Sequence, residues 1–168
     1  MNASTIRTLD DLRKAFKRSE PFDLVHFYAH GGTDNLGHAV LQIGNEETVK
    51  FLDFESWQPN FTRRPLVILN TCDSAAQGTD SFESLVELFV ERGAAGVIGT
   101  QCQVRNLLAG EVMVLFLGQF LRQASAGAAL FSARQTLLAR GDPRGLAYSL
   151  FASSDIRLAL PVLDEGSA

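Results

Sequence analysis

Two residues that could act together as a nucleophile and a base each follow an apolar run. His30 comes after the largely apolar residues 22–29, and Cys72 follows residues 66–69 by two small polar residues. A thiol is a weak nucleophile unless it is deprotonated, and a nearby imidazole can lower its pKa or accept its proton. The pair predicts nucleophilic catalysis by Cys72 with His30 as its base, provided that the fold brings the two side chains together.

The two apolar runs are the elements that must position these side chains. Short runs rich in branched and aromatic residues, bounded by turn formers, are typical of strands buried on both faces of a parallel sheet. If the two strands are parallel neighbours, His30 and Cys72 arrive at the same edge, where α/β proteins bind ligands. Gly31 and Gly32 then predict a glycine turn, and an N–H exposed there could stabilise an oxyanion.

Other uses of these residues remain open. Cys72 could be a small buried hydrophobic residue. Zinc is disfavoured, because His26 and His30 would lie about 13 Å apart on a strand and one zinc ion cannot bridge that span. We interpret His26 as a core histidine or one that supports the site, and His38 as a loop residue with no evident partner. Cys102 follows a third strand and could approach the site, but nothing else marks it as a nucleophile.

The rest of the chain alternates between helical and extended patterns. Thr8 is a predicted N-cap for a first helix, and Ser81 is a predicted N-cap for a helix that ends at Gly93. This alternation predicts one α/β domain over residues 1–168 with a largely parallel sheet. The further predicted elements are a hairpin of residues 40–43 and 48–52, a helical turn in 53–60, a strand at 94–100, helices at 107–123 and 128–139, and strands at 146–152 and 156–160.

Composition narrows the class of protein. The chain has 168 residues, of which 46% are hydrophobic and 20% charged, as in ordinary globular domains. A net charge of −4 with dispersed basic residues gives no reason to expect a nucleic-acid partner. Two cysteines make no disulfide framework, the charged N-terminus does not resemble a signal peptide, and the longest apolar stretch is too short for a bilayer. We therefore expect a cytoplasmic protein with no membrane partner.

Three motifs in order resemble one known family. Residues 26–31 (HFYAHG), 69–74 (LNTCDS) and 93–100 (GAAGVIGT) resemble the CHAT domain, which belongs with the caspases, separases and gingipains. Residues 128–134 and 147–151 resemble its penultimate helix and last strand, so the likeness spans residues 22–160. The resemblance implies a three-layer caspase-like α/β fold, with a mainly parallel central sheet flanked by helices.

Carried over to this sequence, the resemblance implies a catalytic dyad. His30 matches the catalytic histidine, Cys72 the nucleophile, and Gly31 a backbone donor to the oxyanion. The implied reaction is cleavage of a peptide bond in a partner protein, and it needs no metal or organic cofactor. Asp73 follows the cysteine and could favour a basic side chain in the substrate, unless it only hydrogen-bonds its own loop.

Two departures from the family pattern affect substrates and partners. Residues 101–103 (QCQ) stand where the family usually has an aromatic residue, which changes the wall of the implied pocket. Only some twenty residues precede the histidine strand, so the chain is either a compact version or a piece of a larger, regulated protease. CHAT domains commonly follow repeat or sensor domains, which implies a regulatory domain or subunit. A shortened sheet would also expose a strand edge and favour a homodimer or pairing with another chain.

The sequence thus carries three hypotheses from different classes. The first is a cysteine endopeptidase of caspase-like fold that a sensor or partner switches on. The second is a catalytically silent module of the same fold that binds partners through its sheet edge. The third is an unrelated α/β hydrolase or transferase that uses the same thiol. Intact His30 and Cys72 favour the first, although a fold alone does not establish activity.

Overall fold

The computed structural model describes residues 4–17, 22–36, 38–44, 47–59, 61–71, 79–100 and 104–158, with only the backbone described at Thr33 and 79–84. Within these ranges, helices and strands alternate as the sequence predicts. The elements are α1 (Leu9–Phe16), β1 (Leu24–Thr33), β2 (Ala39–Ile43), β3 (Glu47–Lys50), α2 (Phe51–Trp57), β4 (Leu66–Thr71), α3 (Thr79–Glu91), β5 (Gly96–Thr100), α4 (Asn106–Phe120), α5 (Ala126–Ala139), the 3₁₀ helix η1 (Pro143–Ala147) and β6 (Tyr148–Phe151).

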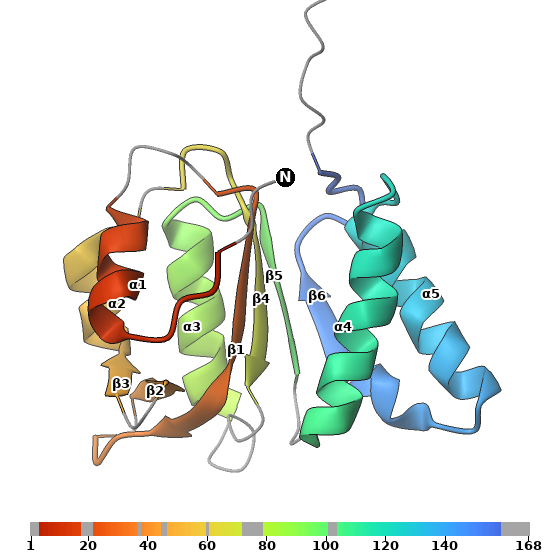
Figure 1. Ribbon diagram of the computed structural model, residues 1–168, viewed down its shortest axis with the longest axis horizontal. Coiled ribbons are helices and arrows are strands. Elements are labelled where there is room, and N and C mark those ends of the chain that lie inside the picture. The colour runs from red at the N-terminus through yellow and green to blue at the C-terminus, as the bar shows by residue number, and fades with distance from the viewer. Residues whose placement is uncertain are drawn as a thin grey trace, which may run out of the picture.

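A six-stranded sheet in the order β3-β2-β1-β4-β5-β6 forms the middle layer. Its centre is parallel, because β4 pairs in parallel with β1 on one side and with β5 on the other. Antiparallel strands extend the sheet at both ends, where β2 pairs with β1, β3 with β2, and β6 with β5. Helices cover both faces (Figure 1). The predicted three-layer caspase-like α/β fold is confirmed, with a parallel centre inside a mixed sheet.

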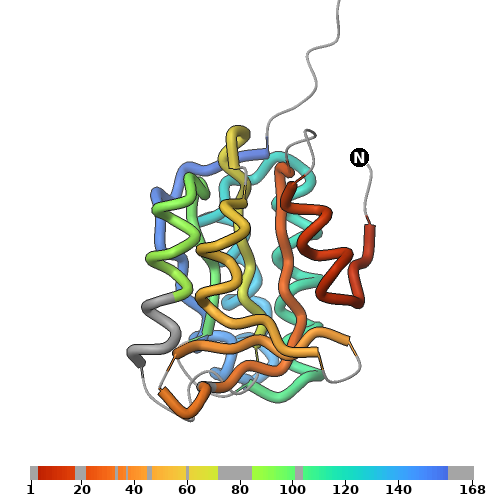
Figure 2. The backbone as a smooth tube through the Cα atoms, turned by 90° about the vertical axis from the view of Figure 1, so that its left-hand side faces the viewer, coloured from red at the N-terminus to blue at the C-terminus, as the bar shows by residue number. Residues whose placement is uncertain are grey.

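One core fills the space between the sheet and the helices α1, α2 and α3, which run side by side in front of it (Figure 2). Aromatic side chains dominate this core. The fully buried ring of Phe54 lies 5.3 to 5.9 Å, between ring centroids, from four neighbouring aromatic rings. Those neighbours are Phe16, Phe27, Trp57 and Phe89. The β2–β3 hairpin packs against the same core through Leu41 and Val49, so the hairpin is anchored on the helical layer.

A second core lies on the opposite face, where α4 and α5 cover β4, β5 and β6. β4 belongs to both cores, and all six of its residues are buried. Such a strand is fixed in place, because full burial of each branched side chain contributes about 1.5–3 kcal/mol. Among the described residues, none of the helices combines the length and apolar character needed to cross a bilayer.

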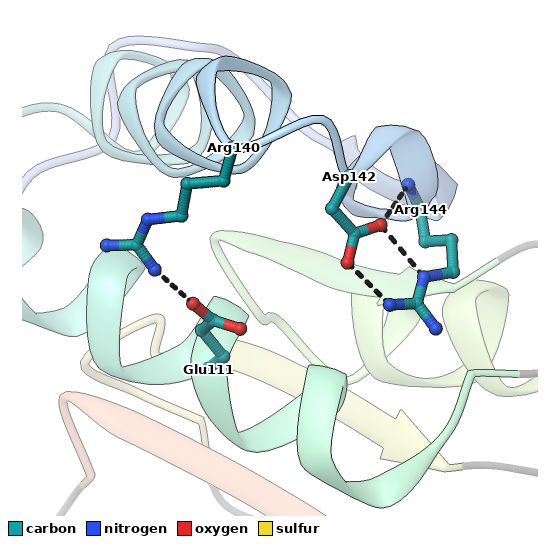
Figure 3. Close-up of polar contacts among 4 residues, drawn as sticks. All are labelled: Glu111, Arg140, Asp142 and Arg144. Carbon is teal, nitrogen blue, oxygen red and sulfur yellow. Dashed lines mark hydrogen bonds and ion pairs between the residues drawn. The ribbon is translucent and has the colours of Figure 1, made fainter.

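Two pairs of charged side chains lie around the turn between α5 and η1 (Figure 3). Glu111 of α4 pairs with Arg140, the C-cap of α5. Asp142 accepts hydrogen bonds from the Arg144 guanidinium at 2.8 and 2.6 Å and from the Arg144 backbone N–H at 3.0 Å. The Arg144 side chain lowers the pKa of Asp142 to about 2. The cluster fixes the turn that leads the chain from α5 into β6.

The predicted cap of the first helix is confirmed, whereas several predicted boundaries differ from the structure. Thr8 caps α1, because its hydroxyl oxygen accepts a hydrogen bond from the Asp11 N–H at 3.2 Å. Residues 51 and 52 belong to α2 and not to the preceding strand, since the Asp53 carboxylate accepts the Lys50 N–H at 2.8 Å and begins the helix there. Helix α3 begins at Thr79, before the predicted cap Ser81.

The predicted closing strand at 156–160 is also wrong over its described part, since residues 156–158 form no strand. The carbonyls of Ser154 and Ile156 instead accept hydrogen bonds from the Gly127 and Ala126 N–H groups, at 2.9 and 2.7 Å. These N–H groups lie in the first turn of α5, where backbone N–H groups have no hydrogen-bond partners within the helix. The segment therefore caps α5 instead of extending the sheet.

Candidate active site

The carboxyl ends of β1 and β4 form the candidate active site. The two strands pair in parallel from Leu24 opposite Leu66 to Ala29 opposite Thr71. His30 directly follows Ala29, and Cys72 directly follows Thr71 in the chain. The prediction that these strands are parallel neighbours is confirmed. Cys72, Asp73 and Cys102 lie outside the described residues, so their roles stay predictions.

His30 lies in an extended strand and not before a turn. The predicted glycine turn is wrong, because Gly31 and Gly32 continue β1 and pair with Leu41 and Val40 of β2. His30 itself lies opposite Gln42. The β2 strand is the antiparallel partner of this last part of β1, and the pairing keeps the glycines extended. The exposed His30 ring therefore lies on a strand that pairs with the β2–β3 hairpin, which packs against the first core.

A small pocket of about 160 Å³ opens beside His30. Its wall carries amide, hydroxyl and imidazole groups, and none of the described residues that line it is a lysine, arginine, aspartate or glutamate. The lining residues are Tyr28, Ala29, His30, Gln42, Gly44, Asn70 and Asn106. A pocket with several convergent polar groups at the carboxyl ends of parallel strands has the usual placement of a binding site in α/β proteins.

Hydrogen bonds hold three of the residues that line this pocket, Asn70, Tyr28 and Asn106. Asn70 is 1% exposed; its Nδ2 donates to the Ala109 carbonyl at 3.1 Å, and its Oδ1 accepts from the Tyr148 hydroxyl at 2.8 Å. Tyr28, which is 54% exposed, donates its hydroxyl to the Asn106 carbonyl at 3.2 Å. The sequence reasoning missed these residues. One available signal was Asn70 itself, a polar residue that directly follows the apolar run of a buried strand.

Comparison with known proteins adds to this geometry. The CHAT domain model matches residues 2–151. The chain belongs to the CHAT domain family. It is also 37% identical over 153 residues to a probable protease of Vitiosangium sp., an alignment that covers 84% of this chain and 20% of that protein. The chain thus spans about one fifth of the length of this relative.

In this CHAT domain, the other histidines have structural surroundings that the sequence did not predict. His26 is exposed and not in the core, although Leu24, two residues earlier on the same face of β1, packs against the second core. Its ring meets that of Tyr28 edge-on at 6.2 Å between centroids. Partial burial against protein atoms still lowers the pKa of His26.

His38, for which the sequence offers no partner, lies beside Asp34 in the turn between β1 and β2. Its Nδ1 is 3.6 Å from Asp34 Oδ2. Asp34 Oδ1 accepts the N–H groups of Leu36 and His38 at 2.9 and 3.0 Å. These bonds, that of Leu36 first, lower the pKa of Asp34. The turn thus fixes the hairpin that pairs with His30.

The described part of this CHAT domain shows no metal-binding constellation. Across these ranges, no three His, Cys, Asp or Glu side chains come together as an ion would require. The chemistry that the described residues themselves offer at the pocket is acid–base chemistry by His30 and hydrogen bonding by neutral groups.

Proposed function

We propose that this CHAT domain is a cysteine endopeptidase in which Cys72 is the nucleophile and His30 is its acid–base partner. One observation carries the proposal: Ala29, which precedes His30, is paired with Thr71, which precedes Cys72. If the register continues by one residue, Cys72 comes opposite His30, with Cα atoms about 5 Å apart. That separation brings a thiol and an imidazole within hydrogen-bonding reach. The name of the Vitiosangium relative, a probable protease, supports the same activity.

The reaction follows from the properties of the two groups. His30 takes the proton of the Cys72 thiol, and the thiolate attacks the peptide carbonyl to form a tetrahedral oxyanion. The Gly31 N–H is the proposed donor to that oxyanion. His30 then protonates the leaving amine, so that the C–N bond breaks and a thioester remains. Water, deprotonated by His30, attacks the thioester, and the thiolate leaves as the acid product departs.

Substrate and regulation are further parts of the proposal. Asp73 would attract a basic substrate side chain, because the described lining of the pocket offers no charge to oppose one. A regulatory or sensor region, in the same polypeptide or in a partner, would control access to the site. The greater length of the Vitiosangium relative is consistent with such a region. We propose a cytoplasmic protein that acts on a peptide or protein substrate and is able to form homodimers.

The pH dependence of thiol alkylation tests the dyad directly. Native protein is labelled with iodoacetamide between pH 5 and 10, and Cys72 and Cys102 are quantified separately by mass spectrometry. An unperturbed thiol titrates near pH ~8.5, so rapid labelling of Cys72 near pH ~6 would identify an activated thiolate. The His30→Ala variant should lose this rapid labelling. His26→Ala is the matched control, because it removes an exposed histidine from the same face of the same strand and should change little.

Proteolysis provides the second readout. Cys72→Ala should abolish cleavage of a proteome-derived peptide library, while Cys102→Ala should retain it. Cleavage that survives in Cys72→Ala would refute the assignment of the nucleophile. If Cys72 and Cys102 react slowly and alike in native and His30→Ala protein, the activated dyad is absent and the interaction-module hypothesis gains.

A further inference from the structure

Four side chains form one row across the sheet, two residues before His30 and Cys72 along the chain. Tyr28 of β1 is paired with Asn70 of β4, and Thr100 of β5 is paired with Tyr148 of β6. Asn70 and Thr100 each follow directly after the paired residues Leu69 and Gly99. The row therefore joins β6 at the outside of the sheet to β1 through both central strands.

Hydrogen bonds tie this row to helix α4. Asn70 uses both ends of its amide, because Oδ1 accepts from Tyr148 and Nδ2 donates to the Ala109 carbonyl. Tyr148 is fully buried, and its own carbonyl accepts from the Arg134 guanidinium of α5. Thr100 Oγ1 and Arg134 Nε have no hydrogen-bond partner among the described residues, so the rigidity rests on the two bonds of Asn70. Loss of either bond would leave a polar atom unpaired in low-dielectric surroundings. Asn70 is thus held between an edge strand and the first turn of α4.

The row lies below the residues proposed to react. Side chains two residues apart on a strand point to the same face. His30 follows Tyr28 by two residues, and Cys72 follows Asn70 by two. If the Asn70 side chain were free to move, the backbone at the carboxyl end of β4, two residues before Cys72, would be less firmly held. The position of this end decides whether thiol and imidazole meet.

We propose that Asn70 and Tyr148 are positioning residues for the Cys72 thiol, an inference that rests on the proposed cysteine peptidase. The Tyr148 hydroxyl fixes the Asn70 amide, and the amide fixes the carboxyl end of β4 against α4. The outer strand β6 thereby affects the reactivity of a thiol at the end of β4, two strands away. A partner that displaced β6 would weaken the dyad without touching either reacting residue.

The Tyr148→Phe variant tests this role by removing a single oxygen atom. The ring still fills its place in the core, and circular dichroism should show a folded protein. Alkylation of Cys72 near pH 6 should fall roughly tenfold or more, because small displacements of reacting groups have large effects on rate. Asn70→Ala should have a similar effect. The double variant should lose no more than the stronger single variant, because both changes remove the same bond.

A second core variant separates positioning from general loosening. Leu137→Ala removes a side chain that is 1% exposed in the same core but forms no hydrogen bond to Asn70 or Tyr148. It should lower the thermal midpoint and leave the pH profile of Cys72 in place. An equal shift of the profile in Leu137→Ala, or an unchanged profile in Tyr148→Phe, would overturn the positioning role while His30→Ala still showed its effect. If His30→Ala itself has no effect on Cys72, the proposed function and this inference fall together.

Discussion

Gly44 offers a sharp test of how the hairpin beside the candidate site is held. It follows β2, has a φ of +62°, and lines the pocket next to His30. A Cβ atom at this position would lie 1.9 Å from the Arg7 carbonyl oxygen. Gly44→Ala therefore combines an unfavourable backbone conformation with a collision against backbone, and neither can be relieved by rotating a side chain.

The expected loss of stability is the sum of two effects. A non-glycine residue in the left-handed region costs about 1–2 kcal/mol. Relief of the collision moves the N-terminal segment away from the hairpin and breaks the bond from the Leu9 N–H to the Glu47 carboxylate, now 2.7 Å long. This exposed bond contributes about 1–2 kcal/mol. The free energy of unfolding should fall by about 2–4 kcal/mol, which lowers the thermal midpoint by about 5–15 °C in a domain of this size.

Two other glycines serve as controls in the same thermal unfolding assay. Gly141 has a φ of +77°, but a Cβ added there would meet nothing within 4 Å, so Gly141→Ala measures the conformational cost alone. Gly118 lies in α4 with equally open surroundings, and Gly118→Ala should raise stability by up to about 1 kcal/mol. If Gly44→Ala costs no more than Gly141→Ala, the contact between the N-terminal segment and the hairpin does not contribute as argued.

Two further predictions concern pH. The pKa of Asp34 is lowered by backbone N–H groups, so the contribution of this carboxylate to stability is complete above the usual value of 3.8 and is lost as pH falls below that value. The difference in thermal midpoint between native protein and Asp34→Ala should therefore shrink from pH 4 towards pH 2.5. A difference that is constant with pH would contradict this prediction. The Arg144 guanidinium lowers the pKa of Asp142 from 3.8 to about 2. The stability lost in Asp142→Ala should therefore be complete above pH 3.8, decrease as the pH falls from 3.8 towards 2, and vanish only below about pH 2. A difference that has already vanished at pH 4 would count against the pairing.

The elements that the sequence predicts best are those whose local and tertiary signals agree. The run 66–69 is apolar at every position, and the structure buries it on both faces as β4. Thr8 carries a side chain suited to capping, and it caps α1. Gly31 and Gly32 show the opposite case. Glycine pairs favour turns locally, but the β2 strand pairs with them and keeps them extended.

The candidate site was predictable only in part. Because β1 and β4 both read as buried parallel strands, their adjacency and the place of His30 could be predicted. The contact between Tyr148 and Asn70 joins residues 78 positions apart. Such a contact depends on the register of two strand pairs, β4 with β5 and β5 with β6, which no local pattern specifies. The pairing of His38 with Asp34 was missed for another reason, since it depends on the conformation of a turn.

The division of the interior into two cores has a consequence for the order of assembly during synthesis. Buried members of the core beneath α1, α2 and α3 come from the chain up to Val97, whereas the opposite core extends to Tyr148. Chains emerge from the ribosome N-terminus first, so the first core can close while α4, α5 and β6 are still being made. His30 and Thr71 would then already lie on paired strands, with the hydroxyl that anchors Asn70 still to come. If Asn70 positions the thiol as proposed, the site would reach its final geometry only when β6 is in place.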